Sequence, residues 1–444
     1  MTDLIVRAGR IVTPSGEQDG SVQVRAGRIR AITGVRDMAA GATVLDVPDD
    51  QVVLPGLVDT HVHINEPGRT EWEGFATATA AAAAGGVTTV VDMPLNSIPP
   101  TVGVDALAVK RSAAHGKVTV DVAFWGGAVP DNLDELAGLH DAGVVGFKCF
   151  LLPSGVDEFG YLDRVGLVAA MRKIADFGGL LIAHAEDPDV IAAAPAPDGR
   201  GYRRFEASRP PGAESAAIDW LLDGTRETGC RTHIVHLSSA DALPAVARAK
   251  AERLPVTVET CPHYLTLCAE QIPDGATQFK CCPPIRGAAN RERLWDALGS
   301  GLVDFVVSDH SPSTIELKRL DSGDFEQAWG GISSLQLGLA LIWTEAYDRG
   351  YQLTDVMRWM AERPARLAGL PGKGTLAVGS DADFSIFDPD GQFIVEAASL
   401  RHRNPITPYA GSRLRGVVHE TWLRGARIDA SSPRGRLLRR GVRA

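Results

Sequence analysis

Residues 52–63 read VVLPGLVDTHVH, a short apolar run that ends in polar residues. In a strand, side chains two positions apart share a face, so His61 and His63 are expected to point the same way. We expect the strand over residues 53–58 and a helix over the Ala-rich residues 76–84. Seven similar apolar runs, each followed by a helical segment, lie at residues 87–93, 118–124, 144–150, 179–185, 232–238, 256–262 and 304–309.

Eight strands that alternate with helices predict an α/β protein with a (β/α)8 TIM barrel. A doubly wound open sheet is the alternative, but no glycine-rich phosphate loop follows the first strand. Both ends of the chain contain short alternating strands, so we expect them to pair in one small β-sandwich domain. The predicted domains are residues 1–52 and 375–444 for the two parts of the sandwich, and 53–374 for the barrel.

Composition limits the classes of partner. The 444 residues are 45% hydrophobic and 23% charged with a net charge of -10, which is typical of a globular enzyme and repels phosphate backbones. We therefore expect no nucleic-acid partner. The sequence shows no signal peptide, and its longest stretch of small residues is interrupted by Gly85 and Gly86, so we expect no membrane span. Six cysteines without paired spacing indicate reduced thiols and a cytoplasmic protein.

The ends of the predicted strands are rich in groups that bind metals. Active sites of such barrels lie at the carboxyl ends of the strands, so these side chains should meet at one rim. An isolated HxH motif is weak evidence, but six candidates from five strands are hard to obtain by chance. The predicted ligands are His61, His63, Lys148, His184, His236 and Asp309.

Other histidines and cysteines have a less specific interpretation. His233 precedes His236 by three residues, so we expect it to face the helices, and His310 should point away from its neighbour Asp309. His263 should lie near the mouth of the barrel without an assigned role. A structural zinc site made of Cys261, His263 and Cys281 or Cys282 is an alternative, but no CxxC half-site supports it.

Lysine is an unusual residue beside divalent cations. Its pKa must fall there, and the neutral amine can then react with carbon dioxide to form a carbamate that bridges two metals. The alternative is that Lys148 only pairs with Asp309. Two metals would activate a water and polarise a carbonyl, and Asp309 could carry the proton to a leaving amide nitrogen. This chemistry indicates hydrolysis of an amide or a related carbonyl.

Several phrases resemble the cyclic amidohydrolases of the dihydropyrimidinase, dihydroorotase and allantoinase group over essentially the whole chain. They are PGLVDTHVHINEPG, GGVTTVVDMPLNS, GFKCFL, LIAHAE, HIVHLSSA, VETCPHYL, KCCPPIR, VSDHSPS and the tail NPITPYAGSRLRGVVHETWLRG. The resemblance implies a binuclear metal centre on the same six residues, with carboxylated Lys148, and a barrel that carries a β-sandwich. Zinc is the expected metal, with iron, cobalt or manganese as alternatives, and the resemblance further implies a homotetramer.

Three departures distinguish the branches of this group. Dihydroorotases of this type usually have Arg where this chain has Asn65, and hydantoinases and dihydropyrimidinases usually have Tyr where it has Pro153. Both differences resemble the allantoinase branch and imply hydrolysis of (S)-allantoin to allantoate in purine and ureide breakdown. Members of that branch commonly have Cys where this chain has Ser313, from which we expect a local effect only.

A neutral, amide-rich substrate needs hydrogen bonds and little formal charge. The candidate substrate contacts lie near strand ends and are Asn65, Asn96, Cys282, Ser311, Gly330 and Gly331. For Asn96 and the two glycines a turn role is as consistent with the sequence. The alternative activities are a hydantoinase or dihydropyrimidinase acting on another cyclic amide, a non-catalytic scaffold, which the intact ligand set disfavours, and a two-metal nuclease or phosphoesterase, which the shortage of basic residues disfavours.

Overall fold

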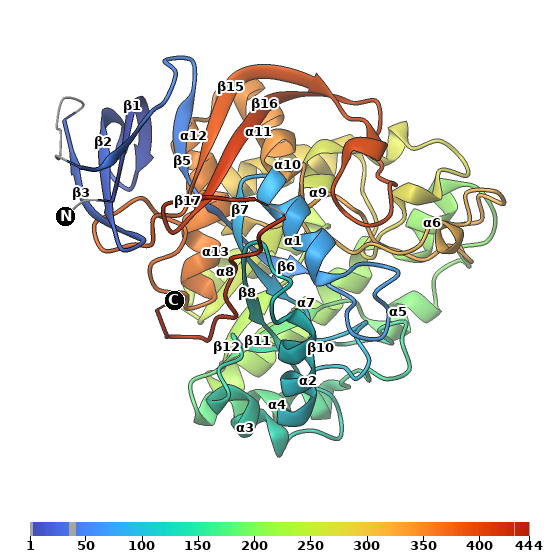
Figure 1. Ribbon diagram of the computed structural model, residues 1–444. Helices are drawn as coiled ribbons and strands as arrows, with labels where there is room; N and C mark the ends of the chain where they lie inside the picture. The colour runs from blue at the N-terminus through green and yellow to red at the C-terminus, as the bar shows by residue number, and fades with distance from the viewer. Residues whose placement is uncertain (1–2, 35–40, 430, 444) are drawn as a thin grey trace.

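A computed structural model describes residues 3–34, 41–429 and 431–443. Its centre is a parallel barrel whose strands are buried on both faces, as their continuous apolar sequences require (Figure 1). The barrel strands are β6 (Leu57–Val62), β7 (Val87–Asp92), β8 (Asp121–Phe124), β9 (Gly126–Gly127), β10 (Phe147–Phe150), β11 (Leu180–His184), β12 (Arg231–Ile234), β13 (Val256–Thr260) and β14 (Phe305–Val306).

Backbone contacts close the barrel. Strands β6, β7 and β8 pair in parallel, and β9 to β14 pair in parallel in chain order. Val145 N donates to Phe124 O at 2.9 Å, which joins the two sheets on one side, and His63 N donates to His310 O at 2.8 Å on the other. The predicted TIM barrel is confirmed, and the doubly wound alternative is wrong.

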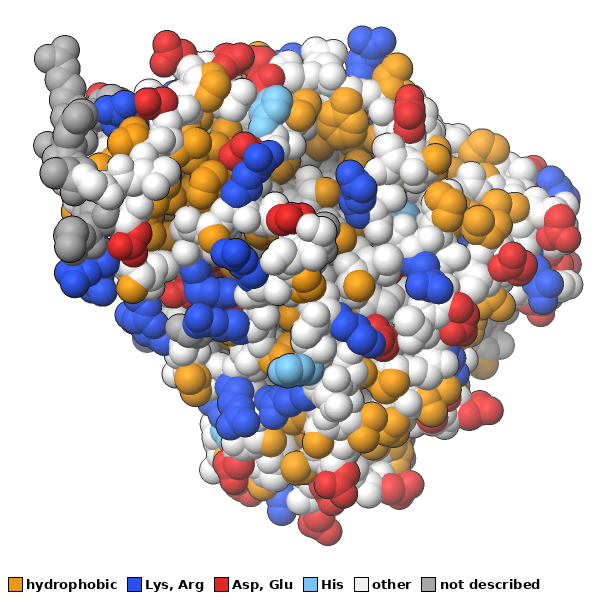
Figure 2. Space-filling model, viewed as in Figure 1, with side chains coloured by type: hydrophobic (Ala, Val, Ile, Leu, Met, Phe, Trp, Pro, Cys, Tyr) orange, Lys and Arg blue, Asp and Glu red, His pale blue; other side chains and the backbone are white. Residues whose placement is uncertain are grey.

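Helices surround the barrel, and the longer ones follow the strands in the predicted alternation (Figure 1). The expected helix at residues 76–84 is α1, which starts one residue earlier. The helices are α1 (Phe75–Ala84), α2 (Val104–Ala114), α3 (Glu135–Asp141), α4 (Arg164–Asp176), α5 (Pro188–Ala192), α6 (Tyr202–Ser208), α7 (Pro211–Thr228), α8 (Leu243–Ala251), α9 (Pro262–Thr266), α10 (Ala288–Gly299), α11 (Gly338–Asp348), α12 (Leu353–Met357) and α13 (Arg363–Leu367). Within the described residues, no helix has the length and apolar character needed to cross a membrane. On the face drawn in Figure 2, acidic, basic and hydrophobic side chains are interspersed.

A second sheet contains strands from both ends of the chain. Its order is β17-β16-β15-β5-β1-β2-β3, with β4 paired to β1, and the antiparallel pair of β5 and β15 joins the two ends. The strands are β1 (Leu4–Thr13), β2 (Gly16–Arg25), β3 (Arg28–Thr33), β4 (Thr43–Asp46), β5 (Val52–Pro55), β15 (Phe384–Ile394), β16 (Arg413–Leu423) and β17 (Ala426–Arg427). The predicted domain boundaries at residues 52/53 and 374/375 stay a prediction.

A buried ion cluster lies between the barrel and this sheet. Lys373 Nζ is 2.6 Å from Asp121 on β8, 2.9 Å from Asp381 and 2.7 Å from Asp383. Arg424 also contacts Asp121, at 2.6 Å. Nearby, the last described segment pairs with the barrel, because residues 435 and 438 donate backbone hydrogen bonds to residues 118 and 122. Charge pairs and backbone pairing thus connect the two parts of the fold.

Candidate active site and metal centre

Three predicted ligands meet where the first and last barrel strands end. His61 is in β6, His63 follows it, and Asp309 lies three residues beyond β14. The Nε2 atoms of His61 and His63 lie 3.2 and 3.6 Å from Asp309 Oδ1. All three residues are buried, and their potential ligand atoms lie within 4.8 Å of one another. This spacing suits three donors around one cation.

The other three predicted ligands line the same cleft, which has a volume of about 370 Å³. His184 ends β11, and His236 lies two residues after β12; their ring centroids are 4.6 Å apart. The His236 ring is in turn 5.4 Å from that of His61. Lys148 in β10 places its Nζ 4.9 Å from the centre of the Phe150 ring, and Phe150 stacks on His184. The barrel therefore gathers the six side chains that the sequence predicts.

Burial sets the charge of these groups. It lowers the pKa of His63 to about 4 and lowers those of His184 and His236, so these rings are neutral donors. Burial also lowers the pKa of Lys148 to about 8, although Asp309 partly opposes the shift. For Asp309 itself, burial acts to raise the pKa, but the facing histidines hold it well below its usual range. The site thus offers neutral imidazoles, a readily deprotonated amine and a carboxylate.

Two buried glutamates orient the histidine rings. His61 Nδ1 lies 2.6 Å from Glu259 Oε1, which directs its Nε2 toward Asp309. His184 Nε2 lies 2.8 Å from Glu186 Oε2, and Arg209 contacts both oxygens of Glu186. Ligating histidines usually hold a carboxylate with their other nitrogen in this way. We did not predict Glu186 or Glu259; their signals were an acid two residues after His184 and an acid inside the apolar run VTVET.

His233 corrects one expectation. Its Nε2 lies 2.9 Å from Glu259 Oε2, on the same carboxylate that holds His61, instead of facing the helices. The alternation of side chains along a strand cannot be extended from His236 to His233, because β12 ends at Ile234 and His236 has a φ of 39°, outside strand geometry.

The residues present fit divalent cations. The buried nitrogens His61 Nε2, His63 Nδ1 and His236 Nδ1 have no hydrogen-bond partner within the described residues. Buried polar groups normally have partners, so such nitrogens in a cleft with a carboxylate indicate a metal site. The alternative zinc site is not formed as predicted: Cys261 and His263 gather with Asp309, and this group includes neither Cys281 nor Cys282.

The predicted substrate contacts fall into two sets. Five line the cleft: Asn96, Cys282, Ser311, Gly330 and Gly331. Asn65 does not line it; its side chain is fully buried, and its amide donates to Pro312 O at 3.3 Å. The cleft also includes residues that we did not predict, among them Phe150, Arg209 and Trp329. His263 is fully buried and does not line the cleft.

Comparison with known proteins places this barrel in a class. Residues 52–428 match the model of the amidohydrolase family, so the chain belongs to that family. Among curated relatives, an allantoinase of Streptomyces avermitilis is 58% identical over 99% of both chains. An allantoinase of Saccharomyces cerevisiae is 49% identical over 84% of this chain and 82% of the relative, and one of Arabidopsis thaliana is 44% identical over 95% and 87%.

Solved structures agree on the architecture. The L-hydantoinase (dihydropyrimidinase) from Arthrobacter aurescens has a TM-score of 0.89 and 32% identity, with 99% of this chain and 98% of that one covered. The dihydropyrimidinase from Brevibacillus agri has a TM-score of 0.88 and 28% identity over the full length of both chains. The fold and the predicted resemblance to cyclic amidohydrolases are therefore confirmed.

Proposed function

We propose that this protein is an allantoinase, a hydrolase that opens the cyclic amide of (S)-allantoin to give allantoate in purine and ureide catabolism. The observation that carries this function is that all six predicted ligands line one cleft. The potential ligand atoms of His61, His63 and Asp309 lie within 4.8 Å of one another. Relatives named allantoinase cover nearly the whole chain at 40 to 58% identity and support the substrate. Hydantoinase activity is the alternative, supported by the structural similarity to the L-hydantoinase of Arthrobacter aurescens.

For the cofactor we propose two divalent metals, which would be held by His61, His63, His184, His236, Asp309 and a carboxylated Lys148. Zinc suits imidazole and carboxylate donors best, and iron, cobalt and manganese accept the same set. The lowered pKa of Lys148, about 8, supports the carbamate, because a neutral amine is the form that reacts with carbon dioxide. When bound, such metals acidify the attacking water and polarise the amide carbonyl.

The chain's own residues then move the proton. Asp309 is ionised and takes the proton from the attacking water as the carbon–oxygen bond forms. It delivers this proton to the amide nitrogen as the carbon–nitrogen bond breaks. Ser311 donates to Asp309 Oδ1 at 2.8 Å and helps to fix the orientation of the carboxylate. We further propose that Asn96, Cys282, Ser311, Gly330 and Gly331 contact the substrate, and that Asn65 shapes the rim from behind.

We also propose that the protein acts as a homotetramer in the cytoplasm. The tetramer rests on resemblance to the cyclic amidohydrolases. The compartment is supported by cysteines that are all free thiols in the structure, as expected in a reducing environment.

One assay tests the activity. The purified protein is loaded with metal and given allantoin, dihydroorotate, dihydrouracil and hydantoin at equal concentration, and metal content is measured on the same sample. We expect kcat/KM for allantoin to exceed the others by orders of magnitude. Faster turnover of hydantoin or dihydrouracil would reject the allantoinase assignment and leave the cyclic amidohydrolase class.

A further inference from the structure

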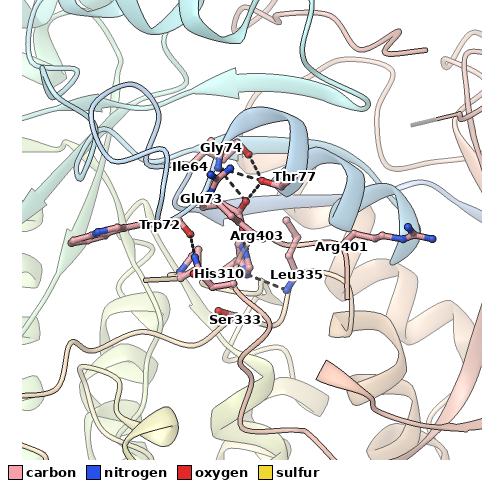
Figure 3. Close-up of polar contacts among 12 residues, drawn as sticks. Ile64, Trp72, Glu73, Gly74, Thr77, His310, Ser333, Leu335, Arg401 and Arg403 are labelled. Atoms are coloured by element: carbon pink, nitrogen blue, oxygen red, sulfur yellow. Dashed lines mark hydrogen bonds and ion pairs between the residues drawn. The ribbon is translucent and has the colours of Figure 1, made fainter. Parts of the chain in front are cut away.

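Glu73 is a buried carboxylate outside the ligand set. It lies just before α1, and its side chain is fully shielded from solvent. Its oxygens accept from Gly74 N at 3.1 Å, from Arg403 N at 3.1 Å and from the Thr77 hydroxyl, and Oε2 lies 3.3 Å from His310 Nε2 (Figure 3). Every contact therefore presents a hydrogen to this carboxylate.

The His310 ring is held in one orientation. Its Nδ1 accepts from Ser334 N at 3.2 Å and from Leu335 N at 3.4 Å, so the ring proton lies on Nε2 and points to Glu73. Figure 3 shows His310 between Glu73 and Leu335. The contacts of the His310 ring thus connect Glu73, which lies before α1, with Ser334 and Leu335.

The main chain of His310 adjoins the reacting groups. His310 directly follows Asp309, and its carbonyl accepts from His63 N at 2.8 Å. Asp309 has a φ of 44°, a conformation that non-glycine residues rarely adopt and that persists only when the surroundings impose it. The fixed His310 ring is one such constraint on the adjacent residue.

A C-terminal segment completes the arrangement. Residues 401–407, which we name the strap, contain the start of the NPITPY phrase. Arg401 N donates to Gln336 Oε1 at 2.8 Å, and Thr407 donates to Ser333 O at 2.8 Å. On the other side, Asn404 Nδ2 donates to Trp72 O at 2.7 Å. The strap therefore ties the segment of Glu73 to the segment that holds His310.

We propose that Glu73 and His310 are positioning residues that hold Asp309 in its catalytic orientation, and that the strap maintains their contact. This role rests on the proposed hydrolase function, because Asp309 is its proton carrier. It does not depend on which cyclic amide is the substrate. Small displacements of a reacting group reduce turnover strongly, so loss of the contact should reduce kcat more than binding.

The test is Glu73→Gln, with Glu71→Gln as the matched control. Glutamine keeps the shape, but its amide group brings a donor against groups that are all donors. Glu71 is exposed and two residues away. We expect Glu73→Gln to lower kcat per folded, metal-loaded protein about tenfold on the substrate that the panel identifies, with KM and metal content close to wild type and a thermal midpoint lowered by the buried donor. The control should match wild type in all four.

Two further variants separate positioning from folding. Asn404 is half-exposed, and Asn404→Ala removes its hydrogen bond to Trp72 O, which loosens the strap. We expect a severalfold lower kcat with metal content unchanged. His310→Asn combined with Glu73→Gln should reduce kcat no more than the stronger single variant, because both break one contact chain. Three results would overturn the proposal. They are a wild-type kcat in Glu73→Gln, a loss of kcat that merely tracks lost metal or lost folded protein, and additive losses of kcat in the double variant. A protein inactive on every cyclic amide would instead reject the proposed function.

Discussion

Lys148 is the side chain whose chemistry depends most on its surroundings. It is buried beside Phe150, and burial lowers its pKa to about 8. We expect Lys148→Ala to lose bound metal and at least 100-fold of kcat, since metal affinity and activity depend on intact ligands. Adding a short carboxylic acid should restore part of both by supplying the missing oxygens. Metal analysis and kcat measured on one preparation check this, and full metal with full rate in the variant would reject the carbamate.

Asp309 allows a second prediction at this scale. Asp309→Asn removes the proton acceptor but keeps the size of the side chain. General acid–base groups contribute about 10²- to 10⁴-fold, so we expect kcat to fall by at least 100-fold while the circular dichroism spectrum stays that of wild type. Turnover within tenfold of wild type would show that another group accepts the proton.

At this scale, the sequence predicted the direction of side chains that belong to regular strands. His61 and His184 are in strands, and both line the cleft, as their positions at strand ends predict. The prediction failed for His233, because the backbone departs from strand geometry before His236, from which its direction was inferred. Glu73 and Glu259 were missed because their role depends on partners distant in sequence, His310 and His61, and no local pattern records such pairs.

At the scale of elements, residues 326–331 form one wall of the cleft, and hydrogen bonds from two lysine side chains hold this wall in place. Lys280 donates to Ala328 O at 2.6 Å, and Lys318 donates to Trp329 O at 3.1 Å. Gly331 has a φ of 121°, and a Cβ there would lie 2.1 Å from Ser311 O. The wall therefore depends on glycine at this position.

We expect Gly331→Ala to lower the free energy of unfolding by about 1–3 kcal/mol and to raise KM, because the wall must move away from Ser311. Gly34→Ala, at a position that does not line the cleft, is the control, since no atom lies within 4 Å of its added Cβ. Chemical unfolding and steady-state kinetics on both variants test this. Equal KM values in the two variants would contradict it.

The strap gives a pH prediction. Burial lowers the pKa of His402 to about 4 from the usual 6.5; the nearby His310 lowers it further and Glu73 opposes the shift. Below pH 6.5 the unfolded chain binds a proton that the folded chain excludes, so the free energy of unfolding falls as the pH drops from 6.5 to 4. The contribution of the neutral His402 ring to the free energy of unfolding is fully present above pH 6.5. We expect His402→Asn to flatten this fall, measured by urea unfolding across the range.

His419→Asn, at an exposed position on β16, is the control and should keep the wild-type slope. An unchanged slope in His402→Asn would reject the assignment of the acid sensitivity to this ring.

The order of elements could be predicted better than their limits. Alternating apolar runs and helices predicted the order of the barrel strands, but the first, expected over residues 53–58, is β6 at residues 57–62, since residues 52–55 form β5 of the terminal sheet. The eighth, expected over residues 304–309, ends at Val306. The reason is that Ser308 N donates to the Asp59 side chain instead of to a neighbouring strand. The third begins at Asp121, three residues later than expected. Such boundaries depend on tertiary hydrogen bonds, which hydrophobic spacing does not report.

At the scale of the whole molecule, the Lys373 cluster joins barrel and terminal sheet. We expect Lys373→Met to lower the free energy of unfolding by about 3–5 kcal/mol, because it leaves the carboxylate of Asp383 buried without its cation, while Asp381 and Asp121 keep Arg28 and Arg424 as partners. Arg172→Met, which breaks an exposed pair with Glu227, should cost less than about 1 kcal/mol. Differential scanning calorimetry of both variants provides the comparison. Equal losses would show that the cluster is no stronger than a surface pair.

The pairing of β5 with β15 also has a consequence for synthesis. Strand β5 ends at Pro55, but its partner begins at Phe384, near the far end of the chain. During translation the barrel strands therefore leave the ribosome while β5 still exposes an unpaired edge, which is open to contact with other nascent chains. A chaperone that shields this edge would raise the yield of active enzyme, and a chain truncated before residue 384 would keep the bare edge and be prone to aggregation.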